Sequence, residues 1–406
     1  MMNHRRTPLL RDITLEDVAD GLKRGNFTSR QLVEVYLARI AEVDDEFHSV
    51  LKINEEALSI AAHLDEEQAR SGRRGPLHGV PILLKDNMWT LDKMSTSAGS
   101  YALLGARRAK EASLVTRLRQ AGAVIIGKAN MSEWANFRST DSSDGWSPRG
   151  EQTIGAYYPG SSPEGSSSGS CVATALGLTF AAVGTESAIK VMAKAGANII
   201  DNANLSSVAE WDAWNAKGRN IQSEVHFREA IEKHCKTLVE NPNNIRTLED
   251  IIKFTKRHPE EDYPSRNTEL WLRSATSEDF QENIEKMVRL SGKESILGAL
   301  DAFNLDVLAV PSAPNPPVTF AARVGLPIIT VPLGFYPPGT LIEKNDRGDL
   351  VERAPGMPFF GKAFSERTLI RVAYAFEQLT HARHKNQPYR LPKTELRDVI
   401  GDLTKS

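Results

Sequence analysis

Residues 79–87 read Gly-Val-Pro-Ile-Leu-Leu-Lys-Asp-Asn, a short apolar run that ends in three polar residues. Such a run is typical of a strand buried on both faces of a sheet, and its polar end predicts that Lys85 lies at a site. A second run, Ala123-Val124-Ile125-Ile126-Gly127, follows a predicted helix over residues 113–121. This alternation of helix and strand predicts an α/β fold with helices on the faces of the sheet.

The pattern extends in both directions from these two strands. On the amino-terminal side, apolar spacing predicts an amphipathic helix over residues 30–40, capped at Thr28 and Ser29, and another over 55–70. Towards the carboxyl end we expect strands and helices at the following ranges: strands at 179–186, 197–201, 305–310 and 327–331, and helices from Cys171, at 187–195 and at 366–383. The strongly charged stretch 241–291 is predicted to be a solvated peripheral layer.

Residues 139–170 are rich in Ser, Gly and Pro, a composition also typical of flexible linkers. The stretch is long and carries Trp146, Tyr157 and Tyr158, and linkers seldom contain bulky aromatic residues. We therefore expect an ordered loop over a site.

Composition excludes several classes of function. The 406 residues are 40% apolar and 25% charged, as in ordinary globular proteins, and 50 basic against 52 acidic residues leave a net charge of -2. This balance gives no electrostatic reason for binding nucleic acid or a membrane surface. The longest nearly apolar run, residues 171–183, is shorter than the about 18 residues that suggest a membrane span. A small molecule or another protein is the expected partner, and no feature specifies an oligomeric state.

The cysteines and histidines predict neither a disulfide framework nor a metal site. Cys171 and Cys235 lack metal-ligand spacing, and the nine histidines show no paired spacing that suits a metal. Without Rossmann or Walker glycine patterns, no cofactor is expected. The amino terminus does not resemble a signal peptide, so a reducing, cytoplasmic compartment is expected.

Two features carry chemistry. Lys85, at the end of an apolar strand, could be desolvated enough to act as a base, although a lysine there is more often a solvated end or half of an ion pair. Gly165-Ser166-Ser167-Ser168-Gly169 could be a turn, an anion-binding nest or a linker. Neither feature is specific alone.

Together and in order, these stretches resemble the motifs of the amidase-signature family. The matching segments are residues 79–87, Gly127-Lys128-Ala129-Asn130-Met131-Ser132-Glu133-Trp134-Ala135, Pro163 to Ser170, Val183-Gly184-Thr185-Glu186, residues 321–334 and Phe364-Ser365-Glu366. The resemblance covers most of the chain. It implies a mixed central β-sheet flanked by helices, in a single amidase-type domain over residues 1–406.

The resemblance also implies roles. The family cleaves or transfers amides through a serine, a cis-serine and a lysine, in which a base activates a weak hydroxyl nucleophile. It places the lysine base at Lys85 and the cis-serine at Ser166, after a cis peptide bond from Gly165. It further places substrate-binding residues at Ala135 and Ser167.

The third member of the relay departs from the family pattern. After Gly184-Thr185-Glu186 the family has a glycine-containing turn that ends in the nucleophilic serine, whereas this chain continues Ser187-Ala188-Ile189-Lys190. The segment from Ala188 to Asp201 resembles one that family members carry much later. An internal deletion at about residues 187–188, which removes the nucleophile helix and the middle segment, is the simplest explanation.

Ser187 is a candidate surrogate because it lies at a predicted strand-to-helix junction, 21 residues after Ser166. The competing interpretation is a helix N-cap, the usual role of a serine at such a place. The short spacing and the missing glycines favour the N-cap.

The sequence thus predicts a hydrolase of amide C–N bonds other than peptide bonds, with a small-molecule amide substrate and catalysis impaired by the missing serine. One alternative is a non-catalytic binding protein or truncated gene product. The other is the A subunit of a glutamine-dependent tRNA amidotransferase, although Gly155-Ala156-Tyr157-Tyr158-Pro159-Gly160 is more similar to stand-alone, fungal-type amidases.

Overall fold

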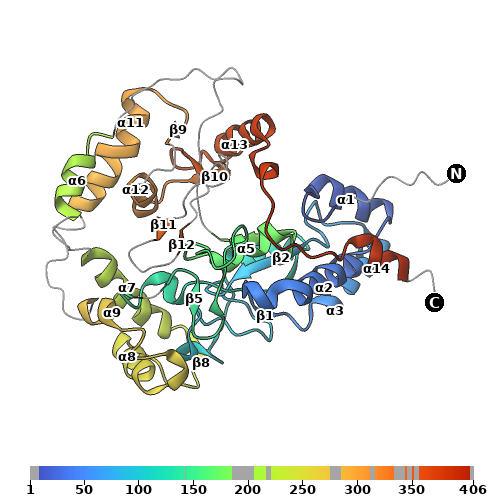
Figure 1. Ribbon diagram of the computed structural model, residues 1–406, viewed down its shortest axis with the longest axis horizontal. Coiled ribbons are helices and arrows are strands. Elements are labelled where there is room, and N and C mark those ends of the chain that lie inside the picture. Colours follow the sequence, from blue (N-terminus) through green and yellow to red (C-terminus); the bar gives the residue numbers. More distant parts are fainter. Residues whose placement is uncertain are drawn as a thin grey trace.

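The computed structural model describes residues 9–141, 143–184, 205–215, 221–274, 285–310, 316–332, 343–344, 350–351 and 356–402 (Figure 1). Ser187, the predicted helix 187–195 and the predicted strand 197–201 lie outside these residues. None of the described helices is both long and apolar enough to cross a membrane.

The two apolar runs from which the fold was predicted, residues 79–87 and 123–127, contribute strands to one four-stranded mixed sheet. Its order is β1 (Val50–Ile53), β4 (Val124–Ala129), β2 (Pro81–Lys85) and β7 (Ala181–Val183). Strand β2 runs parallel to β4 and β7, whereas β1 runs antiparallel to β4. Every residue of β2 and β4 is buried, as their continuous apolar character predicts. The expected α/β class with a mixed central sheet is confirmed.

Helices cover this sheet: α1 (Leu15–Arg24), α2 (Ser29–Phe47), α3 (Ala57–Ser71), α4 (Ser113–Gln120), α5 (Ser168–Leu176) and the distant α14 (Leu396–Asp402). Thr28 caps α2 through a capping box with Gln31. Figure 1 shows α14 beside α2, and these helices pack together. Arg39 of α2 holds the carboxyl-terminal segment there, because its buried guanidinium donates to Gly177 O (2.7 Å) and Thr394 O (2.6 Å).

The Ser- and Gly-rich stretch is ordered, as expected. It contains β5 (Trp146–Ser147) and β6 (Glu151–Gln152), which pair with each other. The buried Asn130 side chain holds it to the sheet, since Nδ2 donates to Gly150 O (2.8 Å) and Oδ1 accepts from Ser147 Oγ (2.7 Å). A second small ladder joins β3 (Arg107–Arg108) to β8 (Leu238–Glu240).

Helices α7 (Ile221–Cys235), α8 (Leu248–Arg257) and α9 (Glu269–Ser274) follow along the chain. The expectation that residues 241–291 form a solvated layer is wrong in part. Three residues of this stretch are each 0% exposed: Ile251 of α8, Trp271 of α9, and Glu261, the last residue of the short helix η4 (Pro259–Glu261). Most of the other charged residues face solvent, but one face of this layer packs against the short helices η1 (Tyr101–Leu103) and η2 (Glu133–Asn136).

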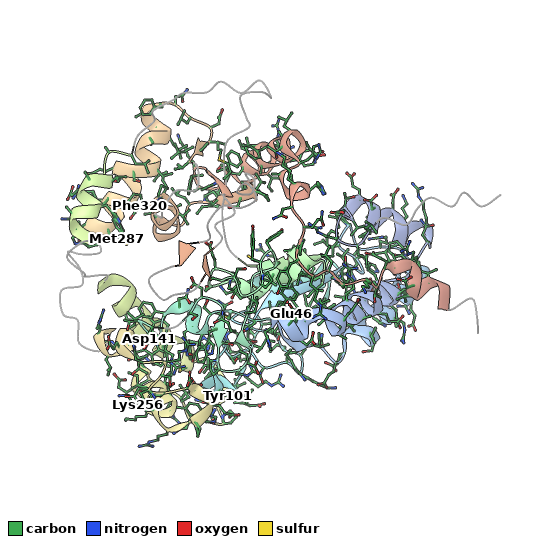
Figure 2. The ribbon with its side chains drawn as sticks, in the orientation of Figure 1. Glu46, Tyr101, Asp141, Lys256, Met287 and Phe320 are labelled. Carbon is green, nitrogen blue, oxygen red and sulfur yellow. The ribbon has the colours of Figure 1, made fainter. Side chains whose placement is uncertain are left out.

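A separate group of elements contains the rest of the described chain. A three-stranded sheet, in the order β10 (Ile328–Pro332), β13 (Gly356–Phe360), β9 (Leu308–Ala309), packs against α13 (Glu366–Thr380). Beside it lie α6 (Val208–Asn215), η5 (Arg289–Ile296), α11 (Leu297–Ala302) and α12 (Pro316–Val324), and β11 (Glu343–Lys344) pairs with β12 (Leu350–Val351). The short helix η6 (Ala382–Lys385) follows α13 and leads towards α14. Met287 and Phe320, labelled in Figure 2, belong to the core of this group.

Candidate active site

Lys85 meets two of the predicted site serines at the end of β2. Its Nζ donates to Ser166 Oγ at 2.7 Å and to Ser167 Oγ at 2.9 Å. The lysine is 4% exposed and Ser167 is 5% exposed, whereas Ser166 is half-buried. Residues 81 positions apart in the chain therefore form one cluster.

The serine loop is held in place by close backbone approaches. The Gly165–Ser166 peptide is cis, as predicted, and Ser166 O accepts from Ser132 N at 3.1 Å. A Cβ on Gly169 would meet Ser49 O at 2.2 Å and Asn130 O at 2.6 Å. Only glycine allows the first turn of α5 to lie this close to β4, and that approach brings the preceding serines over Lys85.

Burial gives Lys85 the acid–base character of a proton acceptor near neutral pH. Desolvation lowers its pKa from 10.5 to about 8, and the lysine forms no ion pair with any described residue. A neutral amine 2.7 Å from a hydroxyl can accept that hydroxyl's proton. The Lys85–Ser166 pair can thus move a proton to or from a third group.

The chain next to this pair leads out of strand β7. Ser170 Oγ donates to Val183 O at 3.3 Å, and a Cβ on Gly184 would lie 2.9 Å from Ser167 Cβ. The described chain therefore lies beside the serine loop up to Gly184. Ser187 lies outside the described residues.

Ala135 occupies an unusual turn on the other side of the cis peptide. Trp134, Ala135 and Asn136 have φ of 50°, 59° and 71°, a left-handed conformation that costs about 1–2 kcal/mol per residue with a side chain. Ala135 is exposed, and a Cβ on Gly165 would meet Ser132 Oγ (2.7 Å) and Asn136 Nδ2 (2.8 Å). The turn thus contacts the serine loop directly.

Several buried charged residues near the site were quoted in the motifs without a role. Asp86 accepts from Ser97 Oγ (2.6 Å) and Gly99 N (3.0 Å), and burial raises its pKa. Burial also lowers the pKa of Lys128 to about 8. Glu133 is buried as well. A charged residue inside a motif that also contains a buried strand is the signal that could have identified them.

No group of three or more His, Cys, Asp or Glu residues in the described ranges is arranged to hold a metal ion. The chemistry available in the described part of the site is that of an amine, two hydroxyls and backbone groups.

The comparison with known proteins gives the family. A relative from Arthroderma benhamiae, named as an amidase, is 33% identical over 539 aligned residues that cover 97% of this chain and 90% of the relative. This chain belongs to the amidase-signature family. The family model described as "Amidase" matches residues 31–189.

Solved amidase structures share the fold. The peptide amidase from Stenotrophomonas maltophilia superposes with a TM-score of 0.75 at 28% identity, covering 94% of this chain and 99% of that one. The A subunit of the glutamyl-tRNA(Gln) amidotransferase from Halorhodospira halophila is 36% identical over 173 residues, which cover 43% of this chain and 34% of that protein. The longer match is therefore with a protein named as an amidase.

Proposed function

We propose that this amidase-family chain keeps the base and the relay serine, Lys85 and Ser166, but lacks the nucleophilic serine and is impaired in amide hydrolysis. The observation that carries the proposal is the 2.7 Å contact of Lys85 Nζ with Ser166 Oγ beside a strand whose continuation, Thr185-Glu186-Ser187-Ala188, has no glycine turn. The base and relay have no hydroxyl to activate at the expected place.

Two features of the comparisons support a deletion. The alignment with the Arthroderma benhamiae relative runs over 539 positions, although this chain has 406 residues, so more than a hundred positions of the relative have no counterpart here. The match to the family model ends at residue 189, next to the proposed junction at residues 187–188.

The physical consequence is a loss of two catalytic elements. The glycine-containing turn supplies the attacking hydroxyl and also the backbone N–H donors that stabilise an oxyanion, and the loss of one such donor can cost about 3 kcal/mol of transition-state stabilisation. Without the hydroxyl, no acyl-enzyme can form. The lineage, with its nucleophile present, would hydrolyse a small-molecule amide C–N bond without a cofactor.

The test is expression of this chain, a small-amide hydrolysis assay that measures amine or ammonia release, and labelling with a serine-reactive fluorophosphonate. We expect neither turnover nor labelling. Labelling that disappears in Ser187→Ala but persists in Ser170→Ala would instead establish Ser187 as the nucleophile and overturn the proposal.

Two other functions give different results in the same preparation. A folded chain that binds small amides without turnover would be a binding protein that has retained the amidase pocket. Copurification with the other components of a tRNA amidotransferase would indicate membership of that complex, which the shorter match to the Halorhodospira halophila protein favours less.

A further inference from the structure

A network of buried charges lies next to the Lys85–Ser166 pair. Arg138 is 1% exposed, Glu133 is 3% exposed and Glu261 is 0% exposed. Arg138 Nη1 contacts Glu133 Oε2 and lies 3.3 Å from Glu261 Oε2, and Arg138 Nη2 donates to Glu261 O and to Arg266 O (3.1 Å). Burying a guanidinium between two carboxyls costs desolvation free energy, which close contacts and further hydrogen bonds must offset.

The network closes the left-handed turn. Glu133 and Arg138 lie on either side of residues 134–136, so their contact connects the two ends of a turn whose backbone conformation is unfavourable. Glu261, which belongs to η4, fixes Arg138 to a different layer of the molecule. Figure 2 shows Tyr101, whose backbone N donates to Glu261 Oε1 at 2.7 Å, beside that layer.

The residues around this turn also contact the loop that carries Ser166. Ser132, which precedes it, donates its N–H to Ser166 O (3.1 Å), and its Oγ accepts from Gly145 N (2.8 Å). Asn136 Nδ2 donates to Asp144 Oδ1 at 2.6 Å, and Gly165 packs among these groups. A continuous set of contacts therefore leads from Glu261 to the Ser166 backbone.

We propose that Glu133, Arg138 and Glu261 are positioning residues that fix the 132–136 turn and, through it, hold the Ser166 hydroxyl over Lys85. The inference rests on the proposed roles of Lys85 and Ser166. It assigns a role to buried residues that do not contact Lys85 or the Ser166 hydroxyl directly.

The two carboxyls differ in their hydrogen-bond partners. Glu261 accepts from Ser100 Oγ (2.8 Å), Tyr101 N, Arg138 and Thr255 Oγ1 (3.4 Å), a set of donors that suits an anion. Glu133 Oε2 accepts from Arg138, a side-chain hydrogen bond with Glu261 also acts on this carboxyl, and its Oε1 has no hydrogen-bond partner among the described residues. Burial, and after it the neighbouring Glu261, raise the pKa of Glu133 well above its ordinary value and so favour its protonated form. We therefore assign Glu261 as the principal counter-ion of Arg138.

This assignment gives a matched pair of variants. Glu133→Gln replaces a carboxyl that is favoured in its protonated form by a neutral amide of the same shape, whereas Glu261→Gln removes the carboxyl that we assign as the counter-ion of Arg138. The measurement is the pH profile of Lys85 acetylation, followed by mass spectrometry in the full chain well below the unfolding temperature. Cys171 is the other titratable group that acts on Lys85, and none of the variants changes it.

We expect the midpoint of the Lys85 profile to rise by about one pH unit in Glu261→Gln, because a displaced serine loop admits water and favours the charged amine. Ser100→Ala, a milder change that removes one donor to Glu261, should shift the midpoint in the same direction by less. Glu133→Gln should keep the wild-type midpoint. Val43→Ala, which creates a cavity in α2 within a hydrophobic cluster that contains no residue of the 132–136 turn, should lower the unfolding temperature without moving the midpoint.

An unchanged midpoint in both Glu261→Gln and Ser100→Ala would overturn the positioning role. A shift in Val43→Ala as large as that in Glu261→Gln would mean that any loss of stability moves the midpoint, and it would overturn the specific positioning role. A shift in Glu133→Gln would overturn the charge assignment. The titration of Lys85 does not depend on turnover, so fluorophosphonate labelling of the wild type would refute the proposed function without affecting this result.

Discussion

At the scale of single residues, the site is defined by a lysine that has hydroxyl partners and no carboxylate among the described residues. An ion pair would hold the amine charged, whereas Ser166 and Ser167 provide hydrogen bonds that an amine can use in either protonation state. Burial is therefore the main influence on the charge of this amine, and it lowers the pKa of Lys85 to about 8. The same residue that is useful as a base is costly for stability near neutral pH.

That cost predicts a pH-dependent stability. Between the folded pKa of about 8 and the ordinary value of 10.5, the unfolded chain holds a proton on Lys85 that the folded chain has released, so stability rises with pH in this window. The contribution between about pH 7 and 9.5 is about 2 kcal/mol. Lys85→Met lacks this titration, so the free energy of unfolding of the variant relative to wild type should fall by about 2 kcal/mol as the pH rises through this range.

Urea unfolding of both proteins across this pH range measures the difference. Lys128, whose pKa is also lowered to about 8, is present in both proteins and cancels. Parallel stability curves would mean that Lys85 is not desolvated in the folded chain.

The sequence predicted the Lys85–Ser166 pair but not the charges that support it. The pair could be found because both residues stand in short motifs with a recognisable order. Arg138 and Glu261 are 123 residues apart and share no motif, and their contact exists only because η4 folds back onto the turn. Nothing in the local pattern specifies such a contact.

At the scale of elements, the relation between α5 and β4 determines where the serine loop lies. The helix was predicted to begin at Cys171, but it begins at Ser168, so part of the loop is its first turn. Ser-rich sequence has no apolar periodicity to mark a helix start, and tertiary contacts with Asn130 decide it instead. Helix α4 was predicted at 113–121 and runs from Ser113 to Gln120, whereas α2 was predicted at 30–40 and continues to Phe47.

Substituting Gly169 tests this packing. In Gly169→Ala the new Cβ would lie 2.2 Å from Ser49 O, a backbone atom just before β1, so α5 must shift. We expect a loss of about 2–3 kcal/mol of stability, typical of overpacking. Gly75→Ala is the matched control, because no atom lies within 4 Å of its new Cβ, and it should change stability by less than about 0.5 kcal/mol.

Chemical denaturation of both variants measures this difference. Equal stabilities for the two alanine variants would show that the close approach of α5 to Asn130 is not required for folding.

At the scale of the whole molecule, the described chain divides into two groups of elements. The hydrophobic clusters around the four-stranded sheet and the α7–α9 layer contain no residue of the clusters around β10, β13 and α12. The closely packed pairs of described elements all fall within one group or the other. Figure 1 shows the same separation, with the α6, α11, α12 and α13 group apart from the sheet that bears Lys85.

This division predicts two unfolding transitions in place of one. Groups without a shared core have little free energy that couples them, so each should unfold with its own midpoint. A deletion that removed the middle segment would have this effect, because a segment between the groups can provide apolar contacts to both.

Two core substitutions separate the transitions. Phe320 packs edge-on against Trp211, with their ring centroids 4.8 Å apart, and Phe47, the last residue of α2, lies in the core of the other group. Each is 0% exposed, so replacement by alanine should cost about 3–5 kcal/mol within its own group. Calorimetry should show Phe320→Ala lowering one midpoint and Phe47→Ala the other, and hydrogen exchange should assign each to its elements. The midpoint of Lys85 acetylation should stay unchanged in Phe320→Ala at temperatures below both transitions. A single transition that both substitutions lower equally would mean instead that the groups fold as one cooperative unit.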